Sequence, residues 1–196
     1  AAEDQLHALA KTQDPEGWLP EYRGMDPGYL TVAVGYLAAY VERGGNPLAH
    51  EIAKRAVNAA SLGVNPDGSF GGSFGSRNTR FLLPHGLELL VEISPTSRWI
   101  LENTLGQGHQ QLVSPANSDD RYFLFFFLWS YLWAKRIRNS RSSMPKVPDL
   151  EADDCPKGGI HRIRSHSWEL VTNSFKGAPF RLYKGSKLIL VESGYS

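Results

Sequence analysis

The residues whose types could do chemistry gather in one stretch, 65–86, which reads NPDGSFGGSFGSRNTRFLLPHG. Arg77, Asn78 and Arg80 bring hydrogen-bond donors and positive charge, and His85 is a candidate base. The tandem GSFG tetrapeptides before them let the backbone take positive φ and approach another surface closely. We therefore expect a long irregular connection between helices that binds or catalyses. The alternative is a glycine-rich surface connection with solvated arginines.

A second group of useful side chains precedes the first strong helix signal. Aromatic and charged residues alternate there, in the order Trp18, Glu21, Tyr22, Arg23, Asp26 and Tyr29. Such a mixture suits a sugar surface. Aromatic residues that pack the start of a helix are an equally good interpretation, so both stay open.

The other reactive side chains form no recognisable metal or cofactor site. His161 and His166 would face opposite ways on one strand, and with Cys155 they make a poor zinc set. The glycine-rich loop lacks the Gly-Lys-Ser/Thr ending of a phosphate loop and does not follow a strand. We expect neither a metal nor a cofactor.

The composition limits the kinds of partner that the chain can bind. The chain has 196 residues, of which 41% are hydrophobic, so it can bury a real core. A formal net charge of +1 argues against nucleic acid or a membrane surface as a bulk partner. No stretch is long and apolar enough for a membrane span. The lone Cys155 excludes an internal disulfide.

Helical signals dominate residues 1–138. Asp26-Pro27 and Asn46-Pro47 are both helix starts, and a stripe of apolar residues follows each. Their short link predicts an antiparallel helical hairpin. Further helices are predicted from Pro84 and from Thr96 or Ser97.

The segment 122–133, YFLFFFLWSYLW, is apolar on nearly every side. We expect a helix buried among other helices, since it is too short to span a bilayer. If some of its neighbours are missing, the exposed apolar surface would drive self-association.

The pattern changes after the last helix. Residues 139–157 have the composition of a linker, and residues 158–196 alternate with a period of two. Strands are predicted at 160–165, 168–171, 180–183 and 188–191, the last two joined by Lys184-Gly185-Ser186. The predicted fold class is α+β, with helical hairpins followed by a short antiparallel β segment.

Several motifs, in this order, resemble the heparinase II/III-like polysaccharide lyases. They are WLPEY from Trp18, DPGY from Asp26, the 68–75 loop with SRNT from Ser76, and PHG from Pro84. The resemblance implies the end of an (α/α) toroid domain in residues 1–138 and the start of a β-sandwich in 158–196. It covers only part of such an enzyme. It also implies a periplasmic or secreted location.

The resemblance also implies β-elimination on a uronic-acid-containing polysaccharide. Asn78 matches the residue that binds the substrate carboxylate, with Arg77, Arg80 and Trp18 as further substrate-binding candidates. His85 and either Tyr22 or Tyr29 are the acid and base candidates. Thr79 departs from the family, whose members carry a His directly after the Asn. A non-catalytic glycan-binding or scaffold fragment of the same fold is the alternative.

Overall fold

The computed structural model describes residues 2–21, 24–106, 121–143, 146, 154–175 and 177–193. The described helices precede the described strands, so the predicted α+β class is confirmed. The helices are α1 (Ala2–Thr12), α2 (Pro27–Glu42), α3 (Leu48–Ala60), a 3-10 turn (Ser61–Gly63), α4 (Pro84–Leu90), α5 (Pro95–Thr104) and α6 (Arg121–Ser140). The strands are β1 (Ile160–Ser165), β2 (Trp168–Asn173), β3 (Phe180–Lys184) and β4 (Lys187–Glu192).

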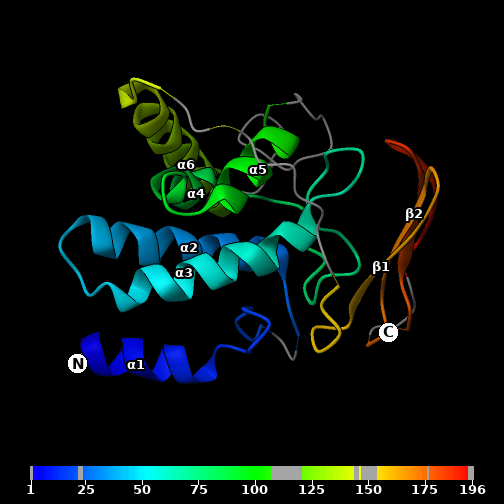
Figure 1. Cartoon of the computed structure of the whole chain (residues 1–196), viewed down its shortest axis with the longest axis horizontal. Helices are drawn as coiled ribbons and strands as arrows, with labels where there is room; N and C mark the ends of the chain where they lie inside the picture. The colour runs from blue at the N-terminus through cyan, green and yellow to red at the C-terminus, as the bar shows by residue number, and fades with distance from the viewer. Residues whose placement is uncertain are drawn as a thin grey trace.

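The α2–α3 hairpin is the centre of the helical part, as the two start signals predicted. α1 packs on one side of this hairpin and α4 to α6 lie on the other, while the sheet stands at one end (Figure 1). Alanines such as Ala38, Ala53 and Ala56 are buried there, and their small side chains let helices approach closely. The pairing of the two helices therefore follows from sequence.

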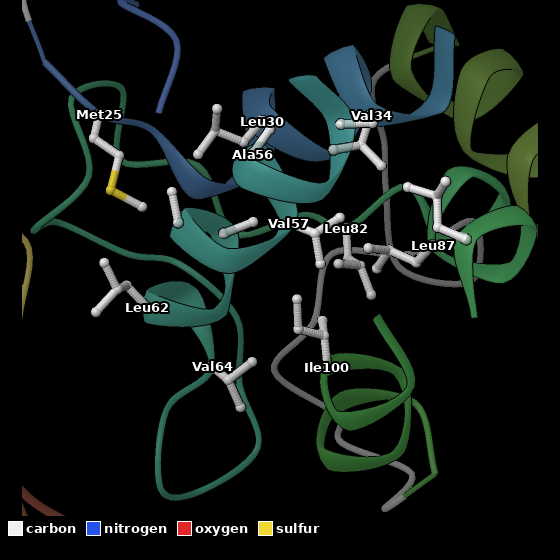
Figure 2. Packing of buried hydrophobic residues seen from close by; sticks show 14 of the residues in the cluster. Met25, Leu30, Val34, Ala56, Val57, Leu62, Val64, Leu82, Leu87 and Ile100 are labelled. Atoms are coloured by element: carbon white, nitrogen blue, oxygen red, sulfur yellow. The ribbon is translucent and has the colours of Figure 1, made fainter. Parts of the chain in front are cut away.

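The core lies between the hairpin and the next helices. Val57 of α3, Leu87 of α4 and Ile100 of α5 point toward one another across this space, with Leu82 of the loop between them (Figure 2). Each is fully or almost fully buried. Burying one such side chain stabilises the fold by about 1.5–3 kcal/mol.

α6 differs from its prediction, which was burial on every side. Phe127, Ser130 and Ala134 are buried on one side of α6, where Phe127 meets Phe81 and Ser130 meets His85 of α4. On the opposite side Phe125 and Leu132 face outward from the described part of the chain, exposed to 72% and 59%. It also runs to Ser140, two residues beyond the predicted boundary at 138.

The sheet is antiparallel with the order β1-β2-β3-β4. Its strands coincide closely with the predicted ones, and Lys184 and Lys187 pair across the predicted turn. Ile160, Val171 and Tyr183 join the core of the helical part, as does Cys155. The sheet and the helices thus share one core, and Cys155 of the predicted linker belongs to it.

Candidate functional site

One buried carboxylate organises the predicted site. Asp26 is fully buried, and its Oδ1 accepts a hydrogen bond from Tyr29 N at 3.1 Å, which caps α2. Its Oδ2 accepts from Arg77 N at 2.9 Å, and Thr79 Oγ1 donates to Oδ1. Asp26 therefore joins the start of α2 to the end of the glycine-rich loop.

The loop is closed tightly on itself. Gly72 N donates to Thr79 O at 2.9 Å, and Ser76 N donates to Met25 O at 2.9 Å. Gly71 has φ +67°, and a Cβ there would lie 2.0 Å from Thr79 O. Only glycine fits at this position, which explains why the first GSFG tetrapeptide ends in glycine.

We call Arg77, Asn78 and Tyr29 the loop surface; Arg77 and Asn78 are exposed, and Tyr29 is half-buried. The Arg77 guanidinium lies 5.3 Å from the centre of the Tyr29 ring, within the range of a cation–π contact. Asn78 is exposed and has φ 56°, a left-handed conformation that asparagine tolerates better than most residues. Arg80 is also exposed. The loop surface thus presents several donors to solvent.

A shallow groove of about 300 Å³ adjoins Tyr29. Tyr29 contributes to its wall together with Leu9, Leu19, Pro20 and Glu21. Trp18 is half-buried on the core, and its indole Nε1 donates to Glu16 at 3.3 Å. Tyr22 lies outside the described residues. Of the two tyrosine candidates, Tyr29 is the one whose place is known.

His85 lies away from the loop surface, in an aromatic layer under α6. It is 2% exposed, and its ring stacks on Trp133 at 5.0 Å and meets Trp129 edge-on at 4.8 Å. Its Nδ1 is 2.7 Å from Ser130 Oγ. Burial lowers the pKa of His85 to about 4, although a hydrogen bond to the Gly35 backbone opposes part of this change. His85 is therefore neutral at pH 7.

The structure does not bring His85 and Asn78 together. Thr79, next to Asn78, packs on Gly28 at the first turn of α2, whereas His85 packs on Gly35. These glycines are two helical turns apart, about 10 Å along α2. Residues 81–84, which connect the end of the loop to His85, are buried. A ligand on the loop surface does not reach the imidazole.

The other side of the glycine-rich loop faces the sheet, which sequence reasoning missed. Arg162 of β1 donates to Leu62 O at 2.7 Å and to Val64 O at 2.6 Å, and it pairs with Glu169. Asn173 of β2 donates to Phe74 O at 2.6 Å. The alternation of polar residues in β1 was visible, but nothing in it indicated that Arg162 would turn inward to backbone carbonyls.

Glu16 makes a similar contact at the junction. Its carboxylate accepts from Lys157 N at 3.1 Å and Gly158 N at 3.2 Å, and Cys155 Sγ lies 2.9 Å from it. These hydrogen bonds lower the pKa of Glu16 against the opposing effect of burial. Burial and the neighbouring Glu16 raise the pKa of Cys155 to about 12, so its thiol is protonated.

No family model, curated protein or solved structure matches this chain. Within the described residues, histidine, cysteine and acidic side chains form no cluster that could hold a metal ion. Nor does any described helix have the length and apolar character needed to cross a membrane. The site is therefore judged from its own geometry.

Proposed function

We propose that this chain binds a uronic-acid-containing polysaccharide at the loop surface and cleaves it by β-elimination. The proposal depends on one observation above all: the exposed Arg77 lies over the ring of Tyr29, which lines a groove, and the exposed Asn78 follows Arg77 in the chain. Cationic and amide donors suit a sugar carboxylate, and an aromatic ring suits the face of a sugar. Asp26 binds the backbone N–H groups of Arg77 and Tyr29 and the hydroxyl of Thr79, so it ties the residues on either side of Asn78 to the start of α2.

In this proposal Asn78 donates to the carboxylate at C5 and Arg77 adds positive charge. Tyr29 is the base that takes the C5 proton; the C4–O bond then breaks and a C4=C5 double bond forms. The proton passes from Tyr29 to the departing glycosidic oxygen, which balances the step and regenerates the base. His85 has no part in it, because it lies beneath Trp129 and Trp133.

A non-catalytic glycan-binding protein is the second candidate. Two observations favour it: His85 is remote from the loop surface, and the Thr79 hydroxyl is already engaged by Asp26. A site that keeps the proposed carboxylate-binding residues, but from which the described His85 is remote, would bind acidic sugars without turnover. We also propose that residues 1–138 are the end of an (α/α) toroid domain.

The test is a panel of uronic-acid polymers, with ultraviolet absorbance of the unsaturated product and calorimetric binding measured in parallel. If Asn78 stabilises developing carboxylate charge, Asn78→Ala should lower kcat by about 100- to 1,000-fold. Asn139→Ala, which removes an exposed asparagine at the end of α6, should have little effect. Arg77→Ala should weaken binding, whereas Lys135→Ala, at an exposed lysine of α6, should not.

The outcomes separate the candidates. Unsaturated product that disappears in Asn78→Ala supports the lyase. Binding that Arg77→Ala weakens, with no product from any polymer, supports the glycan-binding protein instead. Neither product nor binding across the panel would overturn both.

A further inference from the structure

α6 carries a large exposed apolar face that the proposed function does not use. We call it the α6 face; its residues are Phe125, Phe126, Leu128, Trp129 and Leu132, exposed to between 42% and 72%. Together with Tyr36 of α2, which is 60% exposed, they present an area of about 600 Å² when each aromatic side chain is taken as about 200 Å². Soluble monomers rarely expose more than this in one patch.

The chemistry of this face selects an apolar partner. Phe125 and Leu132 are the most exposed members, and neither can form a hydrogen bond. A polysaccharide would gain no hydrogen bond from them. An area of about 600 Å² on each of two partners is within the range of specific protein–protein interfaces, about 1,200 Å² in total.

A hollow adjoins one end of the α6 face. It measures about 430 Å³ and is lined by Tyr36, Ala39, Tyr40 and Arg43 near the end of α2. The Arg43 guanidinium lies 5.9 Å from the Trp133 ring, so the hollow borders the C-terminal half of α6. Phe125 projects from the N-terminal half, eight residues or about 12 Å from Trp133 along the helix.

We propose that the α6 face is an interface with a second copy of this chain. Two α6 helices packed antiparallel about a two-fold axis near Trp129 place the N-terminal half of each beside the C-terminal half of the other. Phe125 of each copy then meets the hollow of its partner, and the same contact forms twice. A projecting ring and a hollow on one face are self-complementary only in this antiparallel arrangement.

Charge predicts how this dimer responds to salt. Arg121, Lys135 and Arg136 are exposed near the two ends of α6, and its sequence contains no acidic residue. Antiparallel pairing brings these like charges near one another at the rim, where salt screens them. Raising the salt concentration should therefore strengthen the dimer. Binding of the same face to an anionic surface would weaken instead, and a flat lipid surface offers nothing to fill the hollow.

Sedimentation equilibrium of the full chain tests this inference, which does not depend on the glycan function. We expect a dimer that tightens as NaCl is raised from about 0.05 to about 0.5 M. Phe125→Asp should raise the dissociation constant by at least about 100-fold, since it puts a charge into the hollow of the partner. Ile163→Asp, a matched change at a residue 59% exposed on the sheet, should leave the constant unchanged.

Folding of each variant is checked by circular dichroism and denaturant unfolding, and Phe125 is exposed enough that its replacement spares the core.

Two cysteine variants give a second measurement: Leu128→Cys, beside the proposed axis, should form a disulfide between copies on mild oxidation, and Ile163→Cys should not. A chain that stays monomeric at about 100 µM would overturn the inference. So would a dimer that Phe125→Asp leaves intact, or a monomer that binds phosphatidylglycerol vesicles through this face.

Discussion

His85 shows how surroundings decide what a residue can do. The sequence made it a candidate base, and a base has to be neutral. In the structure the imidazole is neutral because burial between α2 and two tryptophans disfavours the charged form. The same burial that keeps the ring neutral also removes it from the loop surface.

This burial makes stability depend on pH. The pKa of His85 is about 4 in the folded chain against 6.5 for a model histidine, so only the unfolded state takes up the proton between these values. His85 leaves the free energy of unfolding undiminished well above pH 6.5 and lowers it as the pH drops toward 4. The loss attributable to His85 should be about 2 kcal/mol between pH 7 and pH 5.

Urea unfolding at the two pH values measures this loss, and His85→Gln should abolish that part of it. The His85 imidazole resonance should titrate near pH 4 in the folded protein. An unchanged pH dependence in His85→Gln, or a midpoint near 6.5, would contradict the assignment.

At the scale of elements, Asp26 does more than begin a helix. It caps α2 and also holds Arg77 N and Thr79 Oγ1 of the loop. Asp26→Ala should therefore cost about 2–3 kcal/mol of unfolding free energy, more than a cap alone. Asn46 is the control, since its Oδ1 accepts from Leu48 N and its Nδ2 donates to Glu3 in an exposed contact; Asn46→Ala should cost about 1 kcal/mol.

Both Asp26 and Asn46 variants can be compared by denaturant unfolding at pH 7. Equal costs for the two would mean that the loop contacts of Asp26 add nothing. In that case the loop surface would need another source of rigidity.

At the scale of the molecule, Arg162 connects the sheet to the helices. Its guanidinium satisfies two buried carbonyls of residues 62 and 64 and neutralises Glu169. Arg162→Leu leaves these groups without their donor, so unfolding free energy should fall by about 3–5 kcal/mol. Calorimetry should then show the sheet unfolding before the helices, in two transitions.

Arg164 provides the control, because it pairs with the same Glu169 from a more exposed position. Arg164→Ala should cost less than about 1 kcal/mol and keep a single transition. A single transition in Arg162→Leu would show that the shared core alone couples the two parts.

Sequence predicted what local patterns encode. The helix starts at Asp26 and Asn46 and the alternation in 160–191 fixed the elements, because caps and periodicity act over a few residues. It could not predict that Arg162 and Asn173 would cover one side of the glycine-rich loop, since those contacts join residues about 100 positions apart. Sequence left both full burial and an open apolar side possible for α6, because an apolar pattern shows which residues avoid water but not how many neighbours they find.

The long reach of these contacts also sets an order of events during synthesis. The Val64 carbonyl accepts a hydrogen bond from a residue 98 positions later, and Glu16 accepts one from Lys157 N, 141 positions later. At about 5–20 residues per second, the ribosome needs about 5–20 s to add the residues between Val64 and Arg162. Through that interval the carbonyls of Leu62 and Val64, just before the loop, lack the donor that Arg162 supplies. The glycine-rich loop is thus the last part of the helical region to reach its final surroundings, and the arrival of β1 and β2 completes it.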